Sequence, residues 1–204
     1  LYRLMQNCQP KKLEQPFAVQ TVNHTSANPL YVDFLAWVKQ NLPQYTLGQE
    51  QSFFAGKVFE LQGPTGESNQ YAVLPRKRTL SLAESEQEQI AQLIAIFSVG
   101  SQPVLLKGNN FYQKHAARLP EVIRQQFHII ENIQTGDFDA VLHHGSQNQL
   151  MNLQKQIAQR EGVIVGITHL EPQQLQIPVE RLVIERAISI NTAAAGGNAS
   201  LMTL

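Results

Sequence analysis

The sequence has little charge and almost no cysteine, and each shortage excludes a class of function. Charged residues make up 16% of its 204 residues, and 16 Lys+Arg balance 16 Asp+Glu to a formal net charge of +0. A nucleic-acid-binding surface needs clustered Lys and Arg to neutralise phosphates, and no such cluster stands out. A surface without net charge repels other copies of the chain and other proteins only weakly. We therefore expect its partner to be another protein surface.

Cys8 is the single cysteine, so an internal disulfide is excluded and a reducing cytoplasm is expected. No apolar run reaches the ~20 residues that a membrane span needs. No basic-then-apolar leader is visible either, and we expect a cytoplasmic protein without membrane contact. The chain begins at Leu1 rather than Met, which favours a piece of a longer protein.

Hydrophobic spacing predicts the elements of the first third of the chain. Tyr31, Phe34 and Val38 recur at helical spacing and predict a short helix. Residues 57–61 and 71–74 alternate in polarity around a Gly- and Pro-marked turn, which predicts a β-hairpin. The three basic residues 76–78 are expected to form a solvated rim rather than an anion site.

After residue 80 the pattern alternates between strands and helices. Ser81 with Glu84 has capping-box spacing and predicts a helix that ends at Gly100. Strands are expected at 104–106, 128–130, 139–143 and 163–167, and helices at 110–119, 120–126 and 147–161, the last capped by Ser146. The strand at 163–167 is apolar enough to be central in a parallel sheet.

This alternation predicts an α/β fold with a Rossmann-like doubly wound sheet. A long alternating segment, 178–190, predicts a long strand or a pair of shorter ones, at an edge that another chain could cover. We divide the chain into a lead-in (1–52), a hairpin or flap region (53–80), the α/β domain (81–177) and a terminal β segment with a tail (178–204).

The sequence contains no complete constellation for catalysis, cofactor binding or metal binding. No Gly-x-Gly-x-x-Gly joins a strand to a helix, and residues 143–146 offer only one glycine at the matching place. Neighbouring His143 and His144 point to opposite faces of a strand and cannot easily share a metal. Cys8 has no activating surroundings, and the carboxylates of 84–88 suit the first turn of a helix. We therefore predict no catalytic, cofactor-binding or metal-binding residue.

The C-terminal segment 185–203 closely resembles the terminal motif of long proline utilization A proteins. The resemblance extends upstream to the family's hairpin (Gly63–Glu67, Tyr71, Leu74–Arg76) and to its strand–turn–helix (Phe138–Val141 to His144–Gly145). It implies a fold like the cofactor domain of an aldehyde dehydrogenase, without activity of its own. It also implies a parent chain with an FAD-dependent proline dehydrogenase and an NAD-dependent glutamate-semialdehyde dehydrogenase.

The resemblance also implies that this domain covers the aldehyde dehydrogenase region, seals an internal channel for the semialdehyde and supports a homodimer. The docking tail it implies consists of Asn191, Thr192, Ala193, Ala194, Ala195, Gly196, Gly197, Asn198 and Ser200, and the flap hairpin of Gly63, Pro64, Thr65, Gly66 and Glu67. Two alternatives stay open: a pure oligomerisation module, and a domain that still binds NAD.

Overall fold

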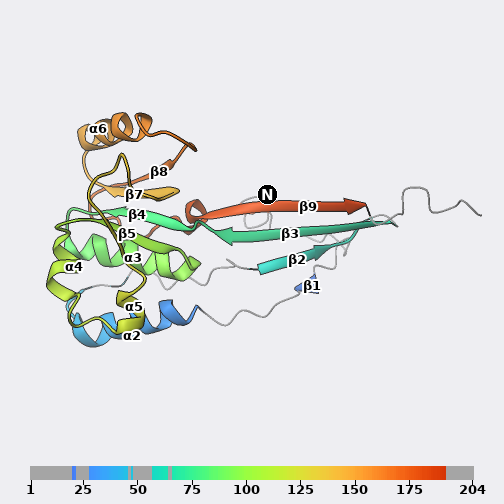
Figure 1. Cartoon of the computed structure of the whole chain (residues 1–204). Coiled ribbons are helices and arrows are strands. Elements are labelled where there is room, and N and C mark those ends of the chain that lie inside the picture. Colours follow the sequence, from blue (N-terminus) through green and yellow to red (C-terminus); the bar gives the residue numbers. More distant parts are fainter. Residues whose placement is uncertain (1–19, 22–27, 46, 48–56, 64–65, 192–204) are drawn as a thin grey trace, which may run out of the picture. The chain divides into compact units, whose positions relative to one another are not determined.

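The computed structural model describes residues 20–21, 28–45, 47, 57–63 and 66–191. They divide into two compact units, with 20–21, 57–74 and 185–191 in the first and 28–45, 47 and 75–184 in the second. Each unit contains one of the two sheets drawn in Figure 1.

The first unit holds an antiparallel sheet in the order β1-β2-β3-β9, with β1 at Gln20–Thr21, β2 at Lys57–Leu61, β3 at Glu67–Pro75 and β9 at Val183–Asn191. Strands β2 and β3 form the predicted hairpin, in a register that pairs Phe59 with Tyr71. The two rings lie 6.0 Å apart, so a cross-strand aromatic pair supports the register. Gly66 has a φ of 91°, a conformation that favours glycine and that closes the turn.

The predicted strand over 178–190 is correct only in its second part. Residues Val179–Leu182 form the 3₁₀ turn η1, and β9 begins at Val183. Pro178 precedes this turn. Proline suits the start of a helical turn because its φ is fixed. The last seven residues of β9 are all exposed, including Ile188 at 37% and Ile190 at 52%.

The second unit holds a parallel sheet in the order β6-β5-β4-β7-β8. Its strands are β4 at Arg78–Leu82, β5 at Gln102–Leu106, β6 at His128–Ile130, β7 at Ala140–His144 and β8 at Gly166–Leu170. The helices of this unit are α2 at Pro29–Asn41, α3 at Glu86–Val99, α4 at Asn110–His115, α5 at Glu121–Arg124 and α6 at Gln147–Ala158. The chain runs outward from β4 in one direction and then in the other, which is Rossmann-like winding and confirms the predicted fold class.

Two apolar clusters fill the second unit. One joins Phe34 and Trp37 of α2 to Phe97 of α3 and to Leu105 of β5. The other joins Leu80 of β4, Val104 of β5 and Val141 of β7 to Leu153 of α6. The sheet is therefore packed on both faces, as a doubly wound sheet requires.

The predicted helix start at Ser81 and Glu84 is wrong. Ser81 lies in β4, and the helix begins four residues later behind the N-cap Ser85, which forms the capping box with Glu88. Both Ser81–Glu84 and Ser85–Glu88 have capping-box spacing. The helix begins behind the second pair's serine because Ser81 is part of β4. Gly100, with a φ of 83°, ends the helix as predicted.

The predicted central strand at 163–167 is also wrong. The strand begins at Gly166 and is β8, at the end of the sheet, while Val163 is 80% and Ile164 98% exposed. The central strand is β4, which periodicity did not reveal because Thr79 and Ser81 interrupt its apolar residues. Both polar side chains are buried and satisfied, Thr79 by Ser101 at 2.9 Å.

Candidate functional site: the crevice at the carboxyl ends of the parallel strands

A crevice of about 670 Å³ lies where the direction of winding changes, between β4 and β7. In open α/β sheets this place outside the carboxyl ends of the strands is where ligands bind. Segments that end or follow β4, β5 and β7 line it, together with the first turns of α3 and α4. The crevice is therefore the position at which a dinucleotide would be expected.

The amide groups at the start of α3 are occupied by the chain's own carboxylate. Glu88 Oε2 accepts hydrogen bonds from the backbone N–H of Ser85 at 2.9 Å and of Glu84 at 3.2 Å. Its Oε1 accepts from the backbone N–H of Gln173 at 2.8 Å. Burial acts to raise the pKa of this carboxyl, but the backbone bonds from Gln173 and Ser85 outweigh it and hold the pKa below its usual value. Glu88 thus caps the backbone N–H groups of Ser85 and Glu84, which precede the first turn of α3.

Glu86 adds a second negative charge beside the first turn of α3. Its carboxylate accepts from Lys114 Nζ at 2.7 Å and from His115 Nε2 at 2.5 Å. Burial acts to raise its pKa, but the bonds from Lys114, His115 and Tyr45 lower it overall. The ring of His115 is 1% exposed and packs edge-on to Trp37 at 5.7 Å, so this contact belongs to the core. Lys114 belongs to the same cluster as Glu86 and His115.

The residues of the crevice do not fit NAD. The segment Leu82–Ser85 that joins β4 to α3 contains no glycine, so no backbone concavity for a pyrophosphate is expected there. Glu84 and Glu86 line the crevice beside the helix start with negative charge, which disfavours phosphates. Lys107, on the other side, pairs with Glu131 at 2.7 Å.

A buried network of amides and hydroxyls lies behind the crevice, with Gln92 of α3 at its centre. Gln92 is 0% exposed, accepts from Ser81 Oγ at 2.6 Å and donates to the carbonyl of Leu82 at 2.9 Å. Its Nε2 also lies 2.7 Å from His144 Nδ1, and His144 Nε2 lies 2.8 Å from the carbonyl of Gln174. His144 is therefore an internal cross-link between β7 and the segment after β8.

His143 points to the other face of β7 and meets a histidine of the next strand. Its Nδ1 lies 3.2 Å from Nδ1 of His169, which is its register partner on β8. Burial, then the nearby His169, lowers the pKa of His143 below its usual value. The sequence reading missed this pair because it placed the strand before residue 168.

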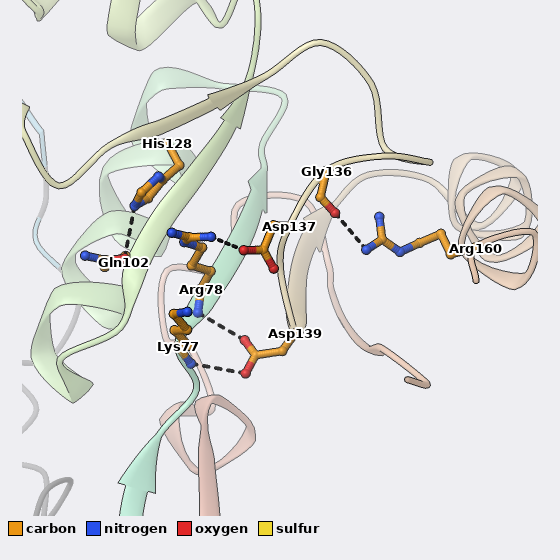
Figure 2. Close-up of polar contacts among 8 residues, drawn as sticks. All are labelled: Lys77, Arg78, Gln102, His128, Gly136, Asp137, Asp139 and Arg160. Carbon is orange, nitrogen blue, oxygen red and sulfur yellow. Dashed lines mark hydrogen bonds and ion pairs between the residues drawn. The ribbon is translucent and has the colours of Figure 1, made fainter. Parts of the chain in front are cut away.

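The basic segment 76–78 lies at the opposite, amino ends of the strands and is used internally (Figure 2). Arg78 forms an ion pair with Asp137, and Asp139 accepts from the backbone N–H of Lys77 and of Arg78, each at 3.1 Å. Only 22% of the Arg78 side chain is exposed. The expectation of a solvated rim is therefore wrong for Arg78, which holds the segment before β7 against β4.

Arg160, just after α6, supports the same segment from another side. It donates to the carbonyl of Gly136 at 2.7 Å, as Figure 2 shows, and its guanidinium lies 4.1 Å from the centre of the Phe138 ring. His128 of β6 bonds Gln102 of β5 at 3.0 Å. These contacts satisfy charges within the unit, so this end of the sheet has no constellation that suggests chemistry.

Of the predicted docking residues of the tail, the structure describes only Asn191. Asn191 is the exposed last residue of β9, and the tail residues 192–200 lie outside the described residues. In the hairpin, Gly63, Gly66 and Glu67 are described and Pro64 and Thr65 are not; Cys8 also lies outside the described residues. In the described parts of the chain no helix is long and apolar enough to cross a membrane.

Sequence comparison identifies the group of proteins to which this chain is related. It is 38% identical over 215 residues to the bifunctional protein PutA of Salmonella typhimurium, which covers 100% of this chain and 16% of that protein. It is 43% identical over 152 residues to PutA of Escherichia coli, covering 74% of this chain and 11% of that protein. This chain is homologous to a region of the PutA proteins. It spans only 11–16% of these two PutA relatives.

Structure comparison gives weaker likenesses. A proline utilization A structure with proline bound in remote sites has a TM-score of 0.43 at 17% identity, covering 69% of this chain and 15% of that one. An apo indole-3-acetaldehyde dehydrogenase has a TM-score of 0.44 at 12% identity, covering 70% and 34%. No family model matches the chain. The assignment to PutA rests on the sequence identities, and the fold class rests on the strand order described above.

Proposed function

We propose that this chain is a non-catalytic domain of a PutA-type bifunctional enzyme of proline catabolism. The parent enzyme, in this proposal, oxidises proline to glutamate through the semialdehyde, with FAD and NAD bound in its other domains and none here. The domain packs on the aldehyde dehydrogenase region, closes the channel through which the semialdehyde passes and supports a homodimer. We place the parent in the cytoplasm and keep the four-part division of the chain given above.

The observation that carries the proposal is the exposure of β9. A nine-residue strand at the end of a sheet presents its backbone to any strand that adds to it. Its exposed residues include Ile188 and Ile190, which gain free energy from burial against a partner. The strand leads directly into the small-residue segment 192–200, whose side chains permit close backbone approach.

The crevice supports the non-catalytic part of the proposal. Glu84 and Glu86 line the crevice at the start of α3, and the segment from β4 to α3 contains no glycine. A cover of this kind contributes sequestration and proximity to a two-step reaction rather than bond chemistry. We therefore expect the cover to affect the coupling of the two reactions and not the rate of either half-reaction.

Deletion of residues 191–204 from the longer PutA-type protein tests the proposal. We expect a lag before NADH forms from proline and a slower coupled rate, because the intermediate escapes into bulk water. The two half-reactions, each assayed with its own substrate, should be unchanged. A matched control replaces the same residues with a Gly/Ser segment of equal length. Unaltered NADH formation in both variants would refute the sealing role.

A pure oligomerisation module is a second candidate, favoured by the same exposed strand. Light scattering on the longer protein with residues 62–68 shortened separates the two, because a change of mass without a lag supports oligomerisation alone. Titration of NAD into the 204-residue chain tests the remaining alternative. Saturable micromolar binding would contradict the proposal that no cofactor binds here.

A further inference from the structure

The histidine pair at the carboxyl ends of β7 and β8 has no role in the proposed function. His143 and His169 are register partners on adjacent parallel strands, and their rings stack at a centroid distance of 5.4 Å with an interplanar angle of 29°. Their Nδ1 atoms lie 3.2 Å apart. A direct contact requires one ring to donate and the other to accept, so at most one proton lies between the two nitrogens.

This spacing is close to that of two imidazoles on one metal ion. Nitrogen ligands lie about 2.0–2.1 Å from Zn²⁺. Two such bonds whose nitrogens are 3.2 Å apart meet at about 100°, between the right angle of a square-planar site and the tetrahedral angle. An ion that replaces the shared proton therefore needs little movement of the strands.

Carboxylates near the pair act against burial, His169 and His144, which all disfavour positive charge on His143. Glu84 acts on His143 with the sign that favours positive charge, and Glu171 Oε1 lies 3.9 Å from His169 Nε2. His144, whose ring bonds Gln92 and Gln174, lies on the opposite face of β7. Burial keeps His143 neutral at ordinary pH, the form in which imidazole binds metals.

Solvent can reach the pair. His143 lines the crevice at the carboxyl ends of the strands, and the side chain of His169 is 21% exposed. Across the ranges that the structure describes, no group of three or more His, Cys, Asp or Glu is arranged to hold a metal. Any site here has two protein ligands and is completed by water, which implies modest affinity.

We propose that His143 and His169 together bind one late first-row divalent cation through their Nδ1 atoms. Imidazole ligands suit Cu²⁺, Ni²⁺ and Zn²⁺, and their affinities should follow the order Cu²⁺ > Ni²⁺ and Cu²⁺ > Zn²⁺. Binding should release protons, because metal ions bind imidazole through a deprotonated ring nitrogen.

The test is a titration of Ni²⁺ and Zn²⁺ into the 204-residue chain with Cys8→Ser, which removes the only thiol. Calorimetry should show one ion per chain, and imidazole ¹⁵N spectra should show that the Nδ1 signals of His143 and His169 shift together. His143→Gln and His169→Gln should each weaken binding roughly tenfold or more. His128→Gln, a half-buried histidine on the far edge of the sheet, is the matched control and should bind as before.

Binding that is equally strong in H143Q and H169Q, or no saturable binding below millimolar ion, would overturn the proposal. Circular dichroism and thermal unfolding establish that each variant is folded. If H143Q is unfolded, H169Q decides, because His169 is the more exposed of the two. The ¹⁵N shifts of the unsubstituted histidines give an answer that depends on neither variant.

Discussion

The parallel sheet buries all five residues of β7, whereas the last seven residues of β9 in the antiparallel sheet are exposed. Charged side chains of the parallel unit also bond within it, with Glu88 on the backbone N–H of Ser85 and Arg78 on Asp137. The comparison shows where each kind of function can reside. We expect a unit whose charges bond one another to act as a scaffold, and we expect β9, the end strand among those that the structure describes, to meet a partner.

Removal of the central amide of the parallel unit should have the largest effect. Gln92→Leu leaves His144 and the carbonyl of Leu82 without this buried amide and removes the acceptor of the Ser81 hydroxyl, which still accepts from Gln89. We expect a loss of about 3 kcal/mol in the free energy of unfolding, measured with urea. Gln154→Leu, on the exposed side of α6, is the control and should change it by less than about 0.5 kcal/mol. Equal losses of unfolding free energy in the two variants would contradict the difference expected between a buried and an exposed amide.

Glu88→Gln should have a smaller and pH-dependent effect. A carboxyl whose pKa is lowered by folding contributes stability that is complete above its unfolded pKa of about 4.3 and is lost as the pH falls through the folded value. We expect E88Q to lose about 2 kcal/mol at pH 7 and to approach the unsubstituted chain below about pH 4. Urea midpoints across that range measure the difference. A constant difference at all pH values would contradict an ionic role for Glu88.

Substitution on the exposed strand should cost less still. Ile188→Ser with Ile190→Ser removes apolar surface that is partly exposed already, so we expect about 1 kcal/mol for the pair in the isolated chain. In the longer PutA-type protein the same double variant should reproduce the lag expected for the tail deletion. A large loss of stability in the isolated chain would mean that β9 belongs to a core.

The smallest effect is expected before β8. Ile164 is 98% exposed, so Ile164→Thr should change the free energy of unfolding by less than about 0.5 kcal/mol. Leu170→Ala, at a residue of β8 that is 1% exposed, should cost about 2–5 kcal/mol. Thermal unfolding of both variants checks this. If Ile164→Thr cost more stability than Leu170→Ala, the result would favour the central strand that the sequence predicted at 163–167.

Sequence reasoning succeeded where apolar spacing and local caps coincide. The helix around Tyr31–Val38, the hairpin over 57–74 and the Ser146 cap all have local causes. It failed at β4 and β8 because the position of a strand within a sheet depends on partners far along the chain. The satisfaction of Thr79 by Ser101, and the full exposure of Ile164, have no local signal.

From the sequence, only what the crevice lacks could be predicted. The missing glycine loop is visible in the sequence, but the contact of Glu88 with the backbone before α3 is not. The segment Ser85–Glu88 does have capping-box spacing, so attention to that second spacing would have located it. The pair His143 and His169 required the register of two strands, which no single-sequence pattern contains.

Glu88 has a further consequence for how this unit responds to its surroundings. A protein that binds a soluble anion at a helix start gains stability in proportion to the logarithm of the ligand concentration. Here the anion is part of the chain and is always present at the same local concentration. The stability that this contact contributes therefore depends on pH, through the charge of Glu88, and not on the concentration of a free anion.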